Sequence, residues 1–222
     1  MVWSDFSPSN TLRGQIPKSF VFVRREGGAA DASFGDSPIT RGFESVLFPY
    51  PGRIDVASGK GKDLTVQALV RPSASANWGW HNFGEHIEQG FGGMQPKEPT
   101  RWPPSSGELP ALAVEITGIM PSAYPKADPA VKPAEVKEGE VAPAPEERTG
   151  VPSAKPVHVV VVADTDFAHD AVYNIYRNVG NRYKGDDFLF VKDLRNVQFA
   201  LNVVDALIGE TQLVGVRNKL PP

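Results

Sequence analysis

The most apolar stretch of the chain is residues 157–162, with the sequence VHVVVV. Six residues are too few for a buried helix, and β-branched side chains favour strands. Continuous apolar runs of this length are typical of strands that are covered on both faces, as in the interior of a parallel sheet. We therefore predict that residues 157–162 form an interior strand of a central sheet.

The strongest helical pattern follows at residues 196–208. One stripe of this helix, spaced three or four residues apart, is apolar and is expected to pack on the sheet. The stripe contains Val197, Leu201, Val204 and Ile208, widened by Ala200, Val203 and Leu207. Gln198, Asn202 and Asp205 are expected to face solvent, and Gly209 supplies a residue that ends helices in the left-handed conformation.

Shorter apolar segments elsewhere predict further strands. They fall at residues 19–23, 46–48, 53–56, 64–70, 111–117 and 213–216. The segment 64–70 alternates between apolar and polar residues, which is typical of a strand with one exposed face. Together with the helix, these segments predict the α/β class, with a mixed sheet, flanking helices and long irregular loops.

Composition divides the chain into three parts. Residues 1–125 are rich in predicted strands, and residues 156–222 hold the strand and helix that complete the same domain. Between them, residues 126–155 are rich in Pro, Ala, Glu and Lys and contain no aromatic residue. Such a composition cannot offset the entropy lost on ordering, so we predict a disordered linker or loop.

Charge and cysteine content exclude several classes of protein. The formal net charge of −3 and the pI near 5.8 provide no basic surface for nucleic acid or for an anionic membrane. The chain has no cysteine, so disulfides, thiolate metal ligands and a cysteine nucleophile are excluded. It begins without the pattern of a signal peptide, and no window holds the ~20 apolar residues that span a bilayer.

The sharpest candidate site is Asp164-Thr165-Asp166, directly after the predicted strand. Ligands of open α/β sheets bind beyond the carboxyl ends of strands, and two carboxylates there could hold a divalent cation. The site would then be that of a metal-dependent transferase or phosphohydrolase. Alternatively, one of these side chains caps the next helix by accepting its free N–H groups.

Two other groups of side chains are weaker candidates. His81, Glu85, His86 and Glu88 cluster in sequence, but their spacing and Gly-rich context favour a solvated loop over a zinc site. Trp78 and Trp80 could form an aromatic platform for a sugar or a protein partner, or could pack a loop onto the domain. We predict no bound metal and no cofactor.

Four segments of the chain form a pattern when taken together and in order. They are SPITRGFESVLFPYPGRIDV at 37–56, LAVEITGIMPSAYP at 112–125, VVVVADTDF at 159–167 and DLRNVQFALNVVDALIGE at 193–210. This pattern resembles the extracytoplasmic region of the GldG-like gliding-motility family, whose members are auxiliary components of ABC-type transport systems. The ending LVGVRNKLPP is similar to the segment that precedes a membrane-spanning helix in that family.

The resemblance implies a non-catalytic binding or scaffold domain, distantly similar to class I glutamine-amidotransferase-like folds. It implies a position on the periplasmic face of the inner membrane, with membrane attachment only through segments outside this chain. The implied partners are the permease and ATPase subunits of an ABC transporter or other envelope proteins. Under this interpretation Asp164, Thr165, Asp166, Trp78 and Trp80 are candidate contacts for a ligand or partner.

Overall fold

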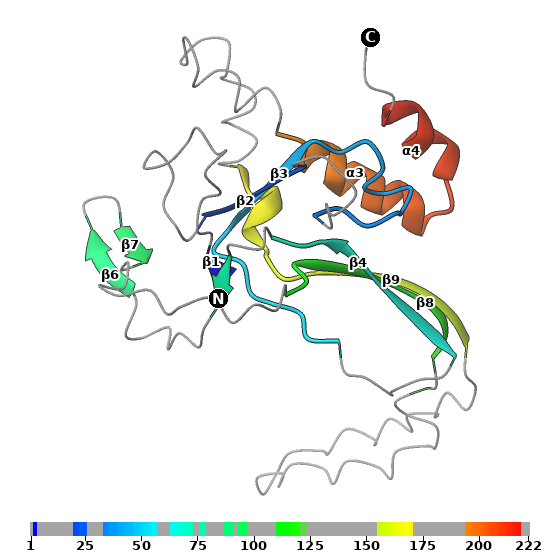
Figure 1. Ribbon diagram of the computed structural model, residues 1–222, viewed down its shortest axis with the longest axis horizontal. Coiled ribbons are helices and arrows are strands. Elements are labelled where there is room, and N and C mark those ends of the chain that lie inside the picture. Colours follow the sequence, from blue (N-terminus) through cyan, green and yellow to red (C-terminus); the bar gives the residue numbers. More distant parts are fainter. Residues whose placement is uncertain are drawn as a thin grey trace, which may run out of the picture.

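The computed structural model is a mixed α/β fold, which confirms the predicted class (Figure 1). The residues that it describes are 2–3, 20–25, 33–56, 63–72, 76–78, 87–90, 93–96, 110–120, 122, 155–170 and 194–218. The predicted linker, up to residue 154, lies outside the described residues. The described strands pair antiparallel and are followed by two helices at the end of the chain.

Two sheets carry the fold. One pairs β2 (Phe20–Arg24) with β3 (Ser45–Pro49). The other has the order β4-β8-β9, with bounds Leu64–Val70, Ala113–Met120 and Lys155–Val162. Two further pairs are short, β1 (Val2–Trp3) with β5 (Asn77–Trp78) and β6 (Ile87–Gly90) with β7 (Gly93–Pro96).

Most of the predicted strands are present, because alternating or continuous apolar runs are strong local signals. Two predictions are wrong. The segment predicted at 53–56 contributes only an isolated bridge between Ile54 and Ala111. The segment predicted at 213–216 lies within a helix, α4 (Thr211–Arg217).

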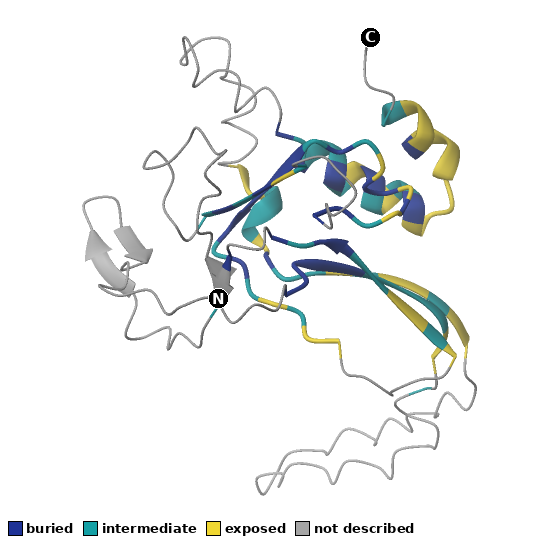
Figure 2. Ribbon diagram, viewed as in Figure 1, coloured by how far each residue is buried: buried dark blue, intermediate teal, exposed yellow. Residues whose placement is uncertain are grey.

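The strand at residues 157–162 is present, but its predicted interior position is wrong. It is part of β9, which pairs antiparallel with β8 and lies at one edge of its sheet. The side chains of Val159 and Val161 are 36% and 40% exposed. Figure 2 shows that exposed residues dominate the end of this sheet that lies farthest from the helices. The apolar run therefore indicates strand propensity here, and not burial on both faces.

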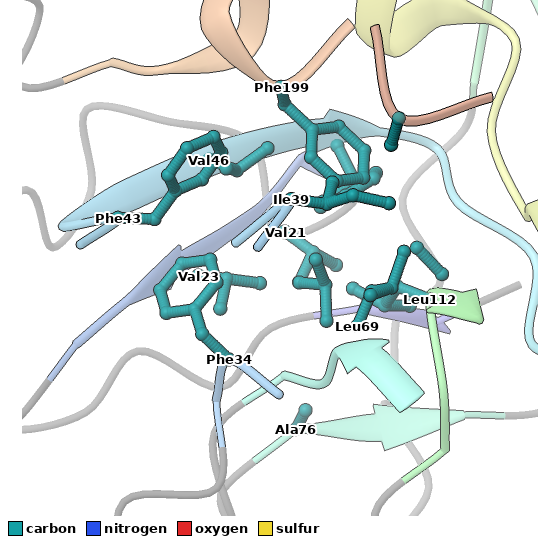
Figure 3. Packing of buried hydrophobic residues seen from close by; sticks show 14 residues of the cluster. Val21, Val23, Phe34, Ile39, Phe43, Val46, Leu69, Ala76, Leu112 and Phe199 are labelled. Atoms are coloured by element: carbon teal, nitrogen blue, oxygen red, sulfur yellow. The ribbon is translucent and has the colours of Figure 1, made fainter. Parts of the chain in front are cut away.

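The core lies where the two sheets and the first helix meet. It joins residues of β2, β3, the turn at 35–43, and the ends of β4 and β8 that lie nearest the helices (Figure 3). Phe199, which is fully buried, contacts the rings of Phe43, Phe48 and Phe167 with centroid separations of 6.1, 6.3 and 5.7 Å. Aromatic rings at these separations and steep interplanar angles pack edge to face, which is their preferred arrangement.

The residues just before the helix α3 (Asn196–Leu207) lie along the edge of β3. Leu194 forms a parallel bridge with Ser45, and Arg195 N–H donates to the Ser45 carbonyl at 3.1 Å. The Asn196 side chain then takes the place of a strand residue beside Leu47. Its Oδ1 accepts the Leu47 N–H at 2.9 Å, and its Nδ2 donates to the Leu47 carbonyl at 2.6 Å.

The location of this helix is as predicted, and Gly209 has the positive φ of 88° expected at its end. The predicted orientation is wrong. The buried residues of α3 are Asn196, Phe199, Asn202 and Ala206. The side chains of Leu201, Val204, Leu207 and Ile208, which were expected to face the sheet, are 46%, 54%, 43% and 67% exposed.

We expect the stability of the fold to depend on Asn202 and not on its neighbour Leu201. Asn202→Ala should lower the free energy of unfolding by about 2–4 kcal/mol, because the buried Ile39 carbonyl loses its amide donor and Arg217 and Asn218 each lose one hydrogen bond. Leu201→Ala should change it by less than about 1 kcal/mol, since that side chain is largely exposed. Alanine is the residue introduced in both variants, so urea denaturation compares them directly. The reverse order of stabilities would contradict the observed orientation.

Candidate functional site

The Asp164 turn is held in place by the backbone where β9 ends. Ala163 N–H donates to the Leu112 carbonyl at 2.8 Å, and the Ala163 carbonyl accepts Gly52 N–H at 2.6 Å. The chain then bends into a short 3-10 helix, η1 (Asp166–Ala168). These bonds bring Asp164 into the protein, where its side chain is 7% exposed.

The carboxylate of Asp164 caps this short helix. Its Oδ1 accepts the backbone N–H of Asp166 at 2.7 Å. Thr165 is exposed and makes no side-chain capping bond, while Asp166 is half-buried. The bond from Asp166 N–H is direct support for the capping interpretation of Asp164.

The second oxygen of Asp164 has a different environment. Oδ2 is buried and has no hydrogen-bond partner in the described part of the chain. The pKa of Asp164 is raised to about 7: burial raises it most, the Asp166 carboxylate also raises it, and the N–H groups of Asp166 and Phe167 lower it. Asp164 therefore loses its proton only near neutral pH, because ionisation leaves a charge that water cannot reach.

These features do not assemble a cation site from described residues. One Asp164 oxygen is already bonded to a backbone N–H, and the other is enclosed. Within the described ranges, no group of three or more His, Asp or Glu side chains is placed to hold a metal ion. Residues 81–86 of the His/Glu cluster lie outside those ranges, and Glu88 has its backbone in β6.

A second cluster joins residues that are remote in the sequence. Ser37 Oγ donates to Glu115 Oε2 at 2.9 Å, and His158 Nε2 lies 2.7 Å from Glu115 Oε1. Glu115 and His158 reach each other diagonally because Glu115 is opposite Val160, and Thr117 is opposite His158. Separations of 78 and 43 residues leave no local signal from which the sequence could predict this cluster.

The order of contacts decides what this cluster can do. A serine nucleophile needs a base that accepts its proton and a third group that orients the base. Here Ser37 donates to the carboxylate, and the imidazole lies on the far side of that carboxylate. Ser37 is also only 1% exposed and accepts Ile39 N–H at 3.3 Å. The cluster therefore ties the turn at 35–43 to the three-stranded sheet.

Trp78 is partly buried and packs against the hydrophobic core. The guanidinium carbon of Arg53 lies 5.5 Å from the centroid of its ring, within the range of a cation–π contact. These contacts support the interpretation that Trp78 packs a loop onto the domain. Trp80, its predicted companion, lies outside the described residues.

A partly buried polar network connects α3 to α4, which the sequence pattern had not indicated. Asn202 is fully buried; its Nδ2 donates to the Ile39 carbonyl at 2.9 Å and to Asn218 Oδ1 at 2.7 Å. Arg217 donates to Asn202 Oδ1 at 2.7 Å and forms a 2.6 Å ion pair with Asp205. Asn218 also donates to the Pro38 carbonyl at 2.7 Å. The network fixes both helices to the turn at 35–43.

The same two helices also expose several large apolar side chains. The exposed large apolar side chains there are Leu201, Val204, Leu207, Ile208, Leu213 and Val216. We call this set the α3–α4 surface. Figure 2 shows exposed residues in both helices, over most of α4 and over parts of α3. No described helix is long and apolar enough to cross a membrane.

Comparison with known proteins assigns the family. A family model described as "ABC-type uncharacterized transport system" matches residues 13–202. Since this match covers most of the chain, the protein belongs to that family and is an auxiliary component of an ABC-type transport system. Neither a curated protein nor a solved structure matches the chain. The similarity to glutamine-amidotransferase-like folds accordingly stays a prediction.

The raised pKa of Asp164 predicts how stability varies with pH. Between about pH 4 and 7 the native state binds more protons than the unfolded state, whose Asp has a pKa of 3.8. The free energy of unfolding should therefore fall as the pH rises through this window. Asp164→Asn should keep the bond from Asp166 N–H, flatten this dependence and raise stability at pH 8.

The measurement is the melting temperature at a series of pH values. Asp170→Asn is the matched control, because Asp170 is exposed and lies close by in the sequence. This control should follow the original protein at every pH. If Asp164→Asn shows the same pH dependence as the original protein, the pH dependence does not arise from Asp164 and the raised pKa of its carboxyl is wrong.

Calorimetric titration with Mg²⁺ or Mn²⁺ tests the alternative of a cation site. We expect no saturable heat, because Asp164 is protonated over much of the accessible range and only one of its oxygens faces a donor. Saturable binding that Asp164→Asn abolishes would instead support the metal-dependent transferase or phosphohydrolase.

Proposed function

We propose that this chain is a non-catalytic binding or scaffold domain that attaches to the membrane and ATPase subunits of its ABC-type transport system. Family membership supports the auxiliary role. The observation that carries the binding role is the α3–α4 surface, a group of apolar side chains that the protein leaves exposed. The three most exposed of them are Val204, Val216 and Ile208, at 54%, 66% and 67%.

Hydrogen bonds and an ion pair between the two helices hold the α3–α4 surface in place. Asn202 and Arg217 fix the helices from beneath, through hydrogen bonds to Asn218 and Asp205. A surface that is fixed before binding loses less conformational entropy when a partner orders on it. Contiguous exposed apolar side chains are typical of contact sites between proteins.

The chemistry of the α3–α4 surface specifies its partner. Its members are aliphatic, and the Arg217 charge is already neutralised by the 2.6 Å pair with Asp205. An apolar, uncharged segment of a transporter subunit therefore complements it, whereas a charged peptide would lose hydration without gaining a partner.

The proposal places the domain on the periplasmic face of the inner membrane, as part of a gliding-motility-like transport system. The resemblance of four separate segments to that family supports this location. Alkaline phosphatase, which is active only outside the cytoplasm, would report the location when fused after this domain in the natural protein. An inactive fusion that is stably produced would contradict the location.

The other two functions draw no support from the described residues. The Asp164 carboxylate is bonded as a helix cap, which argues against the metal-dependent transferase or phosphohydrolase. The ring of Trp78 packs on the core and beneath Arg53, which argues against the carbohydrate-binding module.

Co-purification with the transport system tests the proposal. The full-length protein, gently solubilised from its native membrane, should bring with it a permease subunit and an ATPase subunit of an ABC transporter. Val204→Glu with Ile208→Glu should reduce their recovery at least about tenfold, since two charges would have to be buried without partners. The melting temperature should hardly change, because both side chains are exposed in the free domain.

Val56→Glu is the matched control, because Val56 has the same 54% exposure as Val204 but lies outside the two helices. It should leave recovery unchanged. Equal recovery with the original protein and the doubly substituted variant would contradict the proposed contact surface.

A further inference from the structure

The outer edge of β9 carries backbone groups that no residue in the described part of the chain pairs with. In antiparallel pairs, the N–H and C=O groups of alternate residues point to the same neighbour. Ala163 N–H donates to the Leu112 carbonyl across the β8–β9 register, and Ile119 N–H donates to the Asp63 carbonyl across the β8–β4 register. The backbone N–H and C=O groups of the odd-numbered residues of β9 therefore point to β8.

The even-numbered residues His158, Val160 and Val162 consequently direct their N–H and C=O groups away from the sheet. No described residue hydrogen-bonds to these groups. Free backbone donors and acceptors in an extended strand specify their own complement, which is another extended strand.

Proteins commonly protect exposed edges with charges, prolines or bulges. In β9 these features occur only at the beginning, where Lys155 carries a charge and Pro156 lacks an N–H on the outward side. Residues 157–162 pair with β8 without a bulge and contain no Asp, Glu, Lys or Arg. The open part of the edge thus runs from His158 to Val162.

We propose that this edge pairs antiparallel with β9 of a second copy of the chain, about a two-fold axis at Val160. In this register Val160 lies opposite its own equivalent, and His158 lies opposite Val162 of the other copy. Each opposed pair exchanges two hydrogen bonds, so every outward group from His158 to Val162 is satisfied. Pro156 and the Asp164 turn fall outside the paired region on either side.

The side chains fit the same register. Val159 of one copy lies opposite Val161 of the other, on the face of the sheet where both are now exposed. Cross-strand pairs of β-branched residues stabilise antiparallel sheets. No like charges meet, because Lys155 lies beyond the paired residues. This self-pairing is independent of the α3–α4 surface.

Sedimentation equilibrium over a range of concentrations tests the dimer, with proline and alanine at the same position as matched variants. Proline removes an outward N–H and is tolerated at a free edge, while alanine keeps the N–H. His158→Pro and Val160→Pro should each raise the dissociation constant by about tenfold or more relative to His158→Ala and Val160→Ala. A monomer at all concentrations, or equal effects of proline and alanine, would overturn the proposal.

Disulfide trapping gives an independent result should a proline variant fail to fold. The chain has no cysteine, so each introduced one is unique. Val160→Cys should form a covalent dimer on oxidation, because each copy places this residue opposite itself. His158→Cys, although more exposed, should not form a covalent dimer. In the proposed register His158 of one copy lies opposite Val162 of the other, so the two introduced cysteines are four residues apart along the paired strands. Equal or faster linking through His158→Cys would contradict the register, and capture of a different protein strand by the edge would contradict the two-fold dimer.

Discussion

The orientation of α3 depends on two asparagine side chains, Asn196 and Asn202. Asn196 bonds to both backbone groups of Leu47 and to the Phe167 carbonyl, so it joins the helix to β3 and to η1. Asn202 bonds to the Ile39 carbonyl, Asn218 and Arg217. A buried amide without partners is costly, whereas a fully bonded one selects a single arrangement of the groups around it. With both amides turned inward, the aliphatic stripe of the helix must face outward.

The sequence was sufficient to predict where the longest strands and the helix α3 form, but not how these elements face. The strand at 157–162 and the helix at 196–208 were located correctly, because local apolar patterns and Gly209 act over a few residues. The orientation of α3 depends on backbone partners of Asn196 and Asn202 that lie 149 and 163 residues away. The periodicity rule assumes that apolar residues face the core, and here buried amides and Phe199 take that place.

Only part of the candidate site could be predicted from the sequence. Asp164 was recognised because two carboxylates directly follow a strand, and its capping bond to Asp166 N–H was one of the two interpretations considered. The contacts of Ser37, Glu115 and His158 could not be predicted, since sheet pairing and a distant turn bring them together. In α3, two asparagine side chains are thus bonded inside the fold, and the aliphatic side chains of one stripe are exposed. The proposed binding role rests on this exposed stripe.

A double-mutant cycle between Asn202 and Asn218 tests this account most directly, because Asn202 Nδ2 lies 2.7 Å from Asn218 Oδ1. Unfolding free energies of the original protein, Asn202→Ala, Asn218→Ala and the double variant give the coupling between the two side chains. We predict a coupling of about 1 kcal/mol or more, since the two amides bond directly in a partly buried network. A coupling near zero would show that the inward-facing amides do not fix the helices and would contradict the account.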